Sequence, residues 1–181
     1  MYATAKFQNC SIQKISKLKQ LLIIRHAKSS WDNFTQKDFD RPLNERGHHD
    51  APVMAKRLLD NHIEVDAFIS SPAKRAFTTA KYFAQEYGVA EKSIIQVPAL
   101  YHASKEDFFS AINKTDDTFK TIAIFSHNPG ITQFVNCLTE ARIDNMPTCG
   151  IFVVKAEISH WKDFQKGNKI FLFFDYPKLK G

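Results

Sequence analysis

Four residues of the kind that bind and transfer phosphoryl groups each stand close behind a short apolar run: Arg25, His26, Arg75 and His127. The three runs have the composition of buried strands and span residues 21–24, 68–69 and 122–125. Parallel strands of an α/β sheet end at one common edge, and ligands bind at that edge. The pattern therefore predicts a pocket there, in which two guanidinium groups and two imidazoles lie together.

This set of side chains suits phosphate chemistry. A neutral imidazole can attack phosphorus, and water can remove the labile phosphoramidate that forms. Nearby cations lower the pKa of a histidine, so we expect His26 to be neutral and nucleophilic near pH 7. Arg25 and Arg75 can grip phosphoryl oxygens through their forked donors. A protonated His127 would add a donor, and the backbone amides of residues 71–73, at a helix start, would add a partial positive charge.

The composition fits a globular domain whose net charge comes from its ends. A chain of 181 residues with 44% apolar residues and sixteen Phe is long enough to bury a core. The lysines of the terminal segments account for the whole formal charge of +6: Lys6, Lys14, Lys17, Lys19, Lys178 and Lys180. The residues between them are balanced, whereas a nucleic-acid binder carries its excess charge on the folded surface. We therefore expect no nucleic-acid partner.

Residues 1–19 are predicted to be a basic, poorly ordered N-terminal extension, and residues 20–181 a single domain. The extension is free of acids, as a mitochondrial transit peptide is, but we favour an extension ahead of the first strand. No apolar run is long enough to cross a bilayer, so we expect no membrane partner. Cys10, Cys137 and Cys149 lack metal-binding spacing and are typical of reduced thiols in a cytoplasmic protein, with Cys137 filling the core from a helix.

Apolar periodicity predicts alternating strands and helices. Strands are expected at residues 21–24, 68–69, 94–97, 122–126, 150–157 and 169–175, with the last two as a hairpin-like edge. Helices are expected at residues 44–61, 71–87 and 104–113 and after Pro129. Asn44 should cap the first helix, and Pro52 should kink it or split off its first turn. Ser71 and Pro72 should begin the second helix. The fold class is therefore a three-layer α/β/α sandwich with a mostly parallel central sheet and helices on both faces.

Four motifs, in order along the chain, resemble those of the histidine phosphatase superfamily. They are Arg25-His26-Ala27-Lys28-Ser29 with Trp31-Asp32, Arg41-Pro42-Leu43-Asn44-Glu45-Arg46-Gly47, Ser70-Ser71-Pro72-x-x-Arg75-Ala76-x-x-Thr79-Ala80, and Ser126-His127-Asn128-Pro129. The resemblance runs from about Leu21 to Val154, and four ordered motifs make it specific. Within the superfamily the chain is similar to the SixA-like branch of protein phosphohistidine phosphatases, which implies a phosphoglycerate mutase-like fold.

The resemblance also implies a role for each site residue. His26 would be the transiently phosphorylated nucleophile, and Arg25, Arg75 and His127 would hold the phosphoryl group. Ser29 takes the place at which relatives put a phosphate-contacting hydroxyl. The resemblance implies neither a metal ion nor another cofactor. The partner it implies is a phosphorylated protein of the histidine phosphotransfer type or a small phosphorylated substrate.

One departure from the superfamily affects the expected substrate. Branches that act on alkyl phosphates carry an acid after the third strand, but residues 98–104 contain no carboxylate, and Glu106 is the first to follow. Loss of a general acid costs about 10²–10⁴ in rate on a poor leaving group. The weak P–N bond of phosphohistidine depends less on protonation of the leaving group by a general acid. We therefore favour a metal-independent phosphatase of protein phosphohistidine.

Two alternatives stay open. A small-molecule phosphomonoesterase would need a proton donor, which the loops would have to fold inward from this set of acids: Asp38, Asp40, Glu45 and Glu106. A non-catalytic phosphate-binding module would have no use for the nucleophile His26. The loops at residues 27–43 and 98–106 would decide the specificity, and their sequences show no pattern that identifies the substrate.

Overall fold

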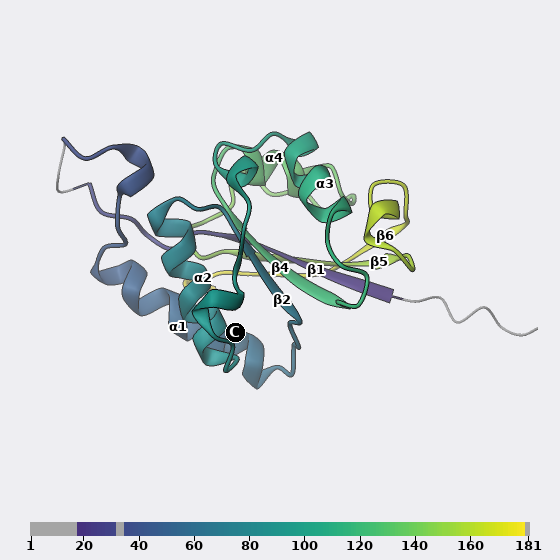
Figure 1. Ribbon diagram of the computed structural model, residues 1–181, viewed down its shortest axis with the longest axis horizontal. Coiled ribbons are helices and arrows are strands. Elements are labelled where there is room, and N and C mark those ends of the chain that lie inside the picture. The colour runs from purple at the N-terminus through teal and green to yellow at the C-terminus, as the bar shows by residue number, and fades with distance from the viewer. Residues whose placement is uncertain (1–17, 32–34, 180–181) are drawn as a thin grey trace, which may run out of the picture.

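The computed structural model describes residues 18–31 and 35–179, which form a six-stranded sheet between two layers of helices (Figure 1). The strands are β1 (Leu18–Arg25), β2 (Ala67–Ser70), β3 (Ile95–Gln96), β4 (Thr121–Ser126), β5 (Ile151–Glu157) and β6 (Lys169–Asp175). The helices are α1 (Glu45–Asp60), α2 (Lys74–Glu86), α3 (Lys105–Asn113) and α4 (Gly130–Asn136). Short 3-10 helices are η1 (Asp38–Asp40), η2 (Glu91–Ser93), η3 (Pro98–Leu100) and η4 (Trp161–Asp163). The predicted α/β/α sandwich is confirmed.

The sheet is parallel over four strands and antiparallel at one edge. Its strand order is β3-β2-β4-β1-β5-β6. The pairs β2–β3, β2–β4 and β1–β4 are parallel, whereas β5 runs antiparallel to both β1 and β6. Both the mostly parallel sheet and the paired strands at its edge are as the sequence predicted.

The strand register brings three chain segments to one level at the edge of the sheet. Arg25, the last residue of β1, is paired with Ser126, the last residue of β4. Ser70, the last residue of β2, is paired with Phe125 on the other side of β4. The residues that follow these strands therefore begin at the same height, although they are far apart in the sequence.

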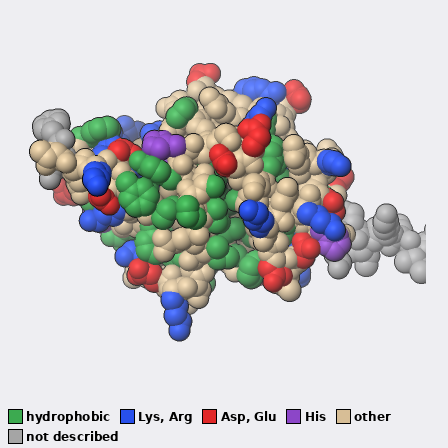
Figure 2. Space-filling view, turned by 45° about the horizontal axis from the view of Figure 1, so that its top comes forward, with side chains coloured by type: hydrophobic (Ala, Val, Ile, Leu, Met, Phe, Trp, Pro, Cys, Tyr) green, Lys and Arg blue, Asp and Glu red, His purple; other side chains and the backbone are tan. Residues whose placement is uncertain are grey.

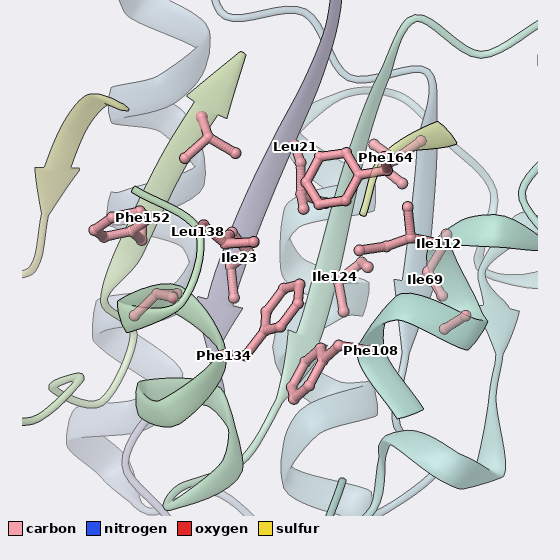
Figure 3. Close-up of a cluster of buried hydrophobic side chains, with 14 of the residues drawn as sticks. Leu21, Ile23, Ile69, Phe108, Ile112, Ile124, Phe134, Leu138, Phe152 and Phe164 are labelled. Atoms are coloured by element: carbon pink, nitrogen blue, oxygen red, sulfur yellow. The ribbon is translucent and has the colours of Figure 1, made fainter. Parts of the chain in front are cut away.

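The central strands are apolar on both faces because helices cover both faces. Leu21 and Ile23 point to the layer of α3 and α4, where the stacked rings of Phe108 and Phe134 lie 4.5 Å apart (Figure 3). Leu22 and Ile24 belong to the opposite cluster, which includes buried residues of α1 and α2. Continuous apolar runs of this kind are typical of parallel strands buried on both faces. This packing fixes the strand ends that carry the site.

Two helix starts test the predicted capping. Asn44 caps α1, and its side chain accepts a hydrogen bond of 3.0 Å from the Gly47 amide. Pro52 lies inside the single helix α1, so the predicted split of the first turn is wrong. Proline cannot donate a hydrogen bond to the carbonyl four residues earlier, which here belongs to the exposed residue His48. The prediction that α2 begins at Ser71 is also wrong. That helix begins at Lys74, after a turn.

The cysteine prediction needs one correction as well. Cys137 is exposed, because α4 ends at Asn136 and the cysteine lies beyond its last turn, whereas Cys149 is buried. The predicted N-terminal extension lies outside the described residues except for Leu18 and Lys19, which belong to β1.

Within the described residues, no helix has both the length and the apolar character that a membrane span requires. On the face seen in Figure 2, basic and acidic side chains are interspersed.

Candidate active site

A cavity of about 260 Å³ opens at the edge where β1, β2 and β4 end. It is lined by Arg25, His26, Lys28, Ser29, Trp31, Asp38, Arg41, Arg75, His102, His127, Asn128 and Thr148. All five residues predicted from the sequence for this site are among them. Four of the lining side chains are basic Arg or Lys and one is a carboxylate, so the cavity is strongly cationic and suits an anion.

His26 is held in one tautomer by contacts with both ring nitrogens. Its Nδ1 donates a hydrogen bond of 2.7 Å to the carbonyl of Ala27, and its Nε2 accepts one of 3.3 Å from Nε of Arg75. The Ala27 amide donates in turn to Oγ1 of Thr79 on α2, at 3.0 Å. The ring therefore carries its proton on Nδ1, and the lone pair of Nε2 faces the guanidinium group.

The electrostatic environment keeps His26 uncharged. Burial lowers its pKa to about 3, and the charges of Arg75 and Arg25 act in the same direction. The hydrogen bond to Ala27 opposes this shift but is outweighed. The sequence predicted a neutral His26 because of its cationic neighbours; the structure shows that burial is the larger cause. A neutral imidazole is the form that can attack phosphorus.

The two predicted arginines differ in how much of their donor capacity is used. Arg25 donates from Nη1 to the carbonyl of Met146 at 2.6 Å, while its buried Nε has no partner within the described residues. Burial, followed by the charge of Arg75, lowers the pKa of Arg25. Arg75 is more fully engaged, because its two terminal nitrogens contact the carboxylate and the carbonyl of Asp38. The ion pair joins Nη2 of Arg75 and Oδ2 of Asp38 at 2.9 Å.

Asp38 is the carboxylate that the loop brings inward. It receives hydrogen bonds from Tyr101 Oη at 2.8 Å and from Arg41 Nη1 at 2.9 Å, besides its contact with Arg75. Burial alone would raise the pKa of Asp38, but the hydrogen bonds from Tyr101, Arg41 and Arg75 outweigh it and hold that pKa well below its usual range. Asp38 is therefore ionised at neutral pH and has no proton to donate to a leaving group.

Arg41 ties the loop after β1 to the cavity. It donates from Nη2 to Oγ of Ser29 at 2.7 Å and from Nε to the carbonyl of Ser30 at 3.0 Å. Its guanidinium group also lies over the ring of Trp31, 3.3 Å from the centroid. Ser29 is thus placed in the cavity by Arg41, and its hydroxyl proton is free to be donated to a bound anion.

His127 lies beside His26, with ring centroids 5.0 Å apart. Its Nε2 is 2.9 Å from Oγ of Ser71. Burial lowers the pKa of His127 to about 2; a proton on the nearby His26 would lower it further, and the positive charge of Arg75 acts in the same direction. The ring of His127 is therefore neutral in this structure, whereas the sequence led us to expect a protonated His127 in a complex with phosphate.

The turn at residues 71–73 precedes α2, which begins at Lys74, and its amides are bonded within the protein. The Ser71 amide donates to the carbonyl of Phe125 at 3.0 Å, and the Ala73 amide donates to Oγ of Ser71 at 3.3 Å. Pro72 has no amide proton. Both available donors are therefore occupied within the protein, and the partial positive charge expected from this turn stays a prediction.

Sequence reasoning missed several lining residues. Arg41 stood in a motif and Asp38 among the possible acids, but neither had been given a place in the phosphate site. Tyr101 and His102 follow η3, where His102 lines the cavity and Tyr101 binds Asp38; neither had a signal of its own beyond its position after the third strand. The other acids considered, Asp40, Glu45 and Glu106, do not line this cavity in the described part of the chain.

The described residues contain a second, larger cavity but no cluster suited to a metal ion. No cluster of three or more His, Cys, Asp or Glu side chains suited to a metal ion occurs in residues 18–31 and 35–179. A larger groove, of about 680 Å³, lies on the α2 side and is lined by residues such as His48, Lys81 and Tyr82. None of the residues that line this groove is buried. The groove therefore lacks buried charged groups of the kind found in the cavity at the sheet edge.

Comparisons with known proteins identify the family. Residues 21–103 match the model of the histidine phosphatase superfamily, branch 1. An uncharacterized chloroplastic protein of Arabidopsis thaliana is 30% identical over 153 residues, which cover 80% of this chain and 70% of that protein. The chain therefore belongs to the histidine phosphatase superfamily.

Solved structures show the same fold. The putative phosphohistidine phosphatase SixA from Agrobacterium tumefaciens superposes with a TM-score of 0.73 at 24% identity, over 88% of this chain and 98% of that one. A protein histidine phosphatase SixA complexed with tungstate gives a TM-score of 0.74 at 21% identity, over 87% of this chain and 97% of that one. The fold is thus that of the SixA phosphatases, as the sequence resemblance implied.

Arg75→Ala should weaken the binding of phosphate or vanadate at least about tenfold, since hydrogen bonds to charged groups contribute roughly 1.5–3 kcal/mol each. Isothermal titration would measure the dissociation constants. Lys74→Ala is the matched control, because Lys74 is the exposed neighbour of Arg75 at the start of α2. An Arg75→Ala protein that binds the anion within about twofold of the wild type would show that Arg75 does not hold it.

The lowered pKa of His26 should make the protein less stable as the pH falls. Below its ordinary pKa of 6.5 the histidine binds a proton in the unfolded chain, whereas in the folded protein it stays neutral down to about pH 3. The stability is therefore complete above about pH 6.5 and decreases below it. His26→Gln should show a shallower decrease between pH 7 and pH 4 in denaturant unfolding, and His49→Gln, at an exposed position, should follow the wild type. Equal slopes for all three proteins would contradict the neutral buried imidazole.

Proposed function

We propose that the protein is a metal-independent phosphatase that works through a phosphohistidine at His26 and acts on phosphohistidine displayed by another protein. The observation that carries the proposal is the buried, neutral His26, whose unprotonated Nε2 faces Arg75 in a cationic cavity. Arg25, Arg75, Ser29 and His127 would bind the phosphoryl oxygens. The tungstate bound to a SixA phosphatase of the same fold supports this, since tungstate is a tetrahedral oxyanion like phosphate.

The reaction would proceed in two displacements. In the first, the lone pair of His26 Nε2 attacks phosphorus, the bond to the leaving group breaks, and the leaving group departs with its electron pair and takes a proton from water. In the second, water attacks the phosphorus of phospho-His26, releases phosphate and restores the neutral ring. The hydrogen bond from Nδ1 to Ala27 stabilises the positive charge that the ring gains when Nε2 is phosphorylated. Guanidinium groups supply the positive charge for which other phosphatases use a metal ion.

Two features of the site favour a phosphohistidine substrate. The carboxylate in the cavity, Asp38, is ionised and paired, so it does not replace the missing general acid. The rim is also open to a large partner: Trp31 is 64% exposed beside the cavity. A phosphohistidine on a protein surface offers a weak P–N bond and can reach such a site without being enclosed.

A small-molecule phosphomonoesterase is the second candidate, and one observation favours it. His102 lines the cavity and lies on the loop after η3, where the superfamily branches that act on alkyl phosphates place an acid. An imidazole there would be able to carry the leaving-group proton. The two candidates therefore differ in how strongly the rate depends on the leaving group.

The proposal predicts a steep dependence on the leaving group. A histidine-phosphorylated protein and p-nitrophenyl phosphate should be turned over, whereas phosphoserine should lag by about two orders of magnitude, the usual worth of a positioned general acid. The three rates would be measured with EDTA present. Glu106→Gln is the control and should change none of them, because Glu106 lies outside the cavity.

A wild-type rate that hardly depends on the leaving group, together with a strong dependence in His102→Ala, would contradict the phosphohistidine proposal and establish the small-molecule enzyme. Binding of phosphate without turnover of any substrate would indicate a phosphate-binding module instead. Activity that EDTA removes and Mg²⁺ restores would contradict the metal-independent mechanism.

A further inference from the structure

The ring of His127 leaves one nitrogen unused. Nδ1 is buried and has no hydrogen-bond partner within the described residues, and Nε of Arg25 is in the same state. Both side chains line the cavity. Leaving a buried polar atom unpaired costs free energy, so such atoms call for an explanation, and at a binding site the ligand provides the partner. The protonation state of His127 Nδ1 then decides whether it can donate to an anion.

Ser71 determines that state through its own hydrogen-bond balance. Its side chain is fully buried, and Oγ accepts a hydrogen bond from the Ala73 amide at 3.3 Å. The hydroxyl of Ser71 has one proton to donate, and the Ala73 amide cannot accept it because that amide is itself a donor. Among the contacts of the described residues, the acceptor in reach is Nε2 of His127, at 2.9 Å. A ring nitrogen that accepts this proton is unprotonated, so in a neutral ring the proton is on Nδ1.

We propose that Ser71 is a positioning residue that holds His127 in the Nδ1–H tautomer, so that the neutral ring donates a hydrogen bond from Nδ1 to a phosphoryl oxygen. Without Ser71, the ring would be free to protonate Nε2 and present a lone pair to the anion, which would repel it. The rings of His26 and His127 are 5.0 Å apart, so a phosphoryl group on His26 lies within reach of its neighbour. The identity of the anion rests on the proposed function, but the tautomer does not.

The tautomer is measurable without a substrate. In ¹⁵N-labelled protein, long-range proton–nitrogen NMR spectra distinguish protonated from unprotonated ring nitrogens, and His127→Gln assigns the signals. In the wild type we expect protonated Nδ1 and unprotonated Nε2 for His127. In Ser71→Ala we expect the opposite tautomer or a mixture, and in Ser71→Thr, which keeps the hydroxyl, the wild-type pattern. A wild-type ring with protonated Nε2 overturns the proposal even if no variant folds.

Anion binding tests the consequence. Ser71→Ala should weaken vanadate binding about two- to tenfold, the effect of one neutral hydrogen bond, and Ser71→Thr should restore it. Ser70→Ala is the matched control, since the neighbouring buried serine donates to the carbonyl of Ser71 and not to His127. The effects of Ser71→Ala and His127→Ala should be non-additive, because one acts through the other. Unchanged binding in Ser71→Ala, or full additivity in the double variant, would contradict the role of Ser71.

Discussion

The site depends on the burial of an imidazole among guanidinium groups. Burial removes the water that would stabilise a protonated His26, and the neighbouring charges of Arg75 and Arg25 disfavour it further. The same desolvation strengthens the attraction between these cations and an incoming phosphoryl group. A neutral imidazole in a cationic pocket is the combination that phosphoryl transfer to histidine requires. The register of β1, β2 and β4 makes it possible, because it brings distant segments to one level.

Asp38 sets a limit on this accumulation of positive charge. Its carboxylate pairs with Arg75 and Arg41 and accepts a hydrogen bond from Tyr101, so the loop after β1 is attached to the cavity through polar and charged contacts. An anion that binds Arg75 competes with Asp38 for its terminal nitrogens. The carboxylate therefore holds the guanidinium group in place and would lower the affinity of Arg75 for an anion.

The sequence predicted the parts of the structure that follow from local patterns. The apolar runs before Arg25 and His127 identified β1 and β4, and parallel pairing then required the two segments to meet. Asn44 identified the start of α1 because its capping bond to Gly47 is local. The start of α2 was misplaced, since Ser71 and Pro72 resemble a helix cap, whereas Ser71 instead contacts His127 across the sheet edge. Asp38 and Tyr101 could not be placed from the sequence, because their positions depend on a loop that packs against Arg75.

The central claim is that His26 becomes phosphorylated during turnover. The protein would be mixed with ³²P-labelled histidine-phosphorylated protein, denatured at alkaline pH within one turnover, and digested so that the labelled peptide is identified by mass spectrometry. We expect a label on His26 that is stable in base and lost in acid, and that forms at least as fast as steady-state turnover. His26→Ala should fold, carry no label and show no turnover. Undiminished activity in His26→Ala, or wild-type turnover without a labelled intermediate on His26, would contradict it.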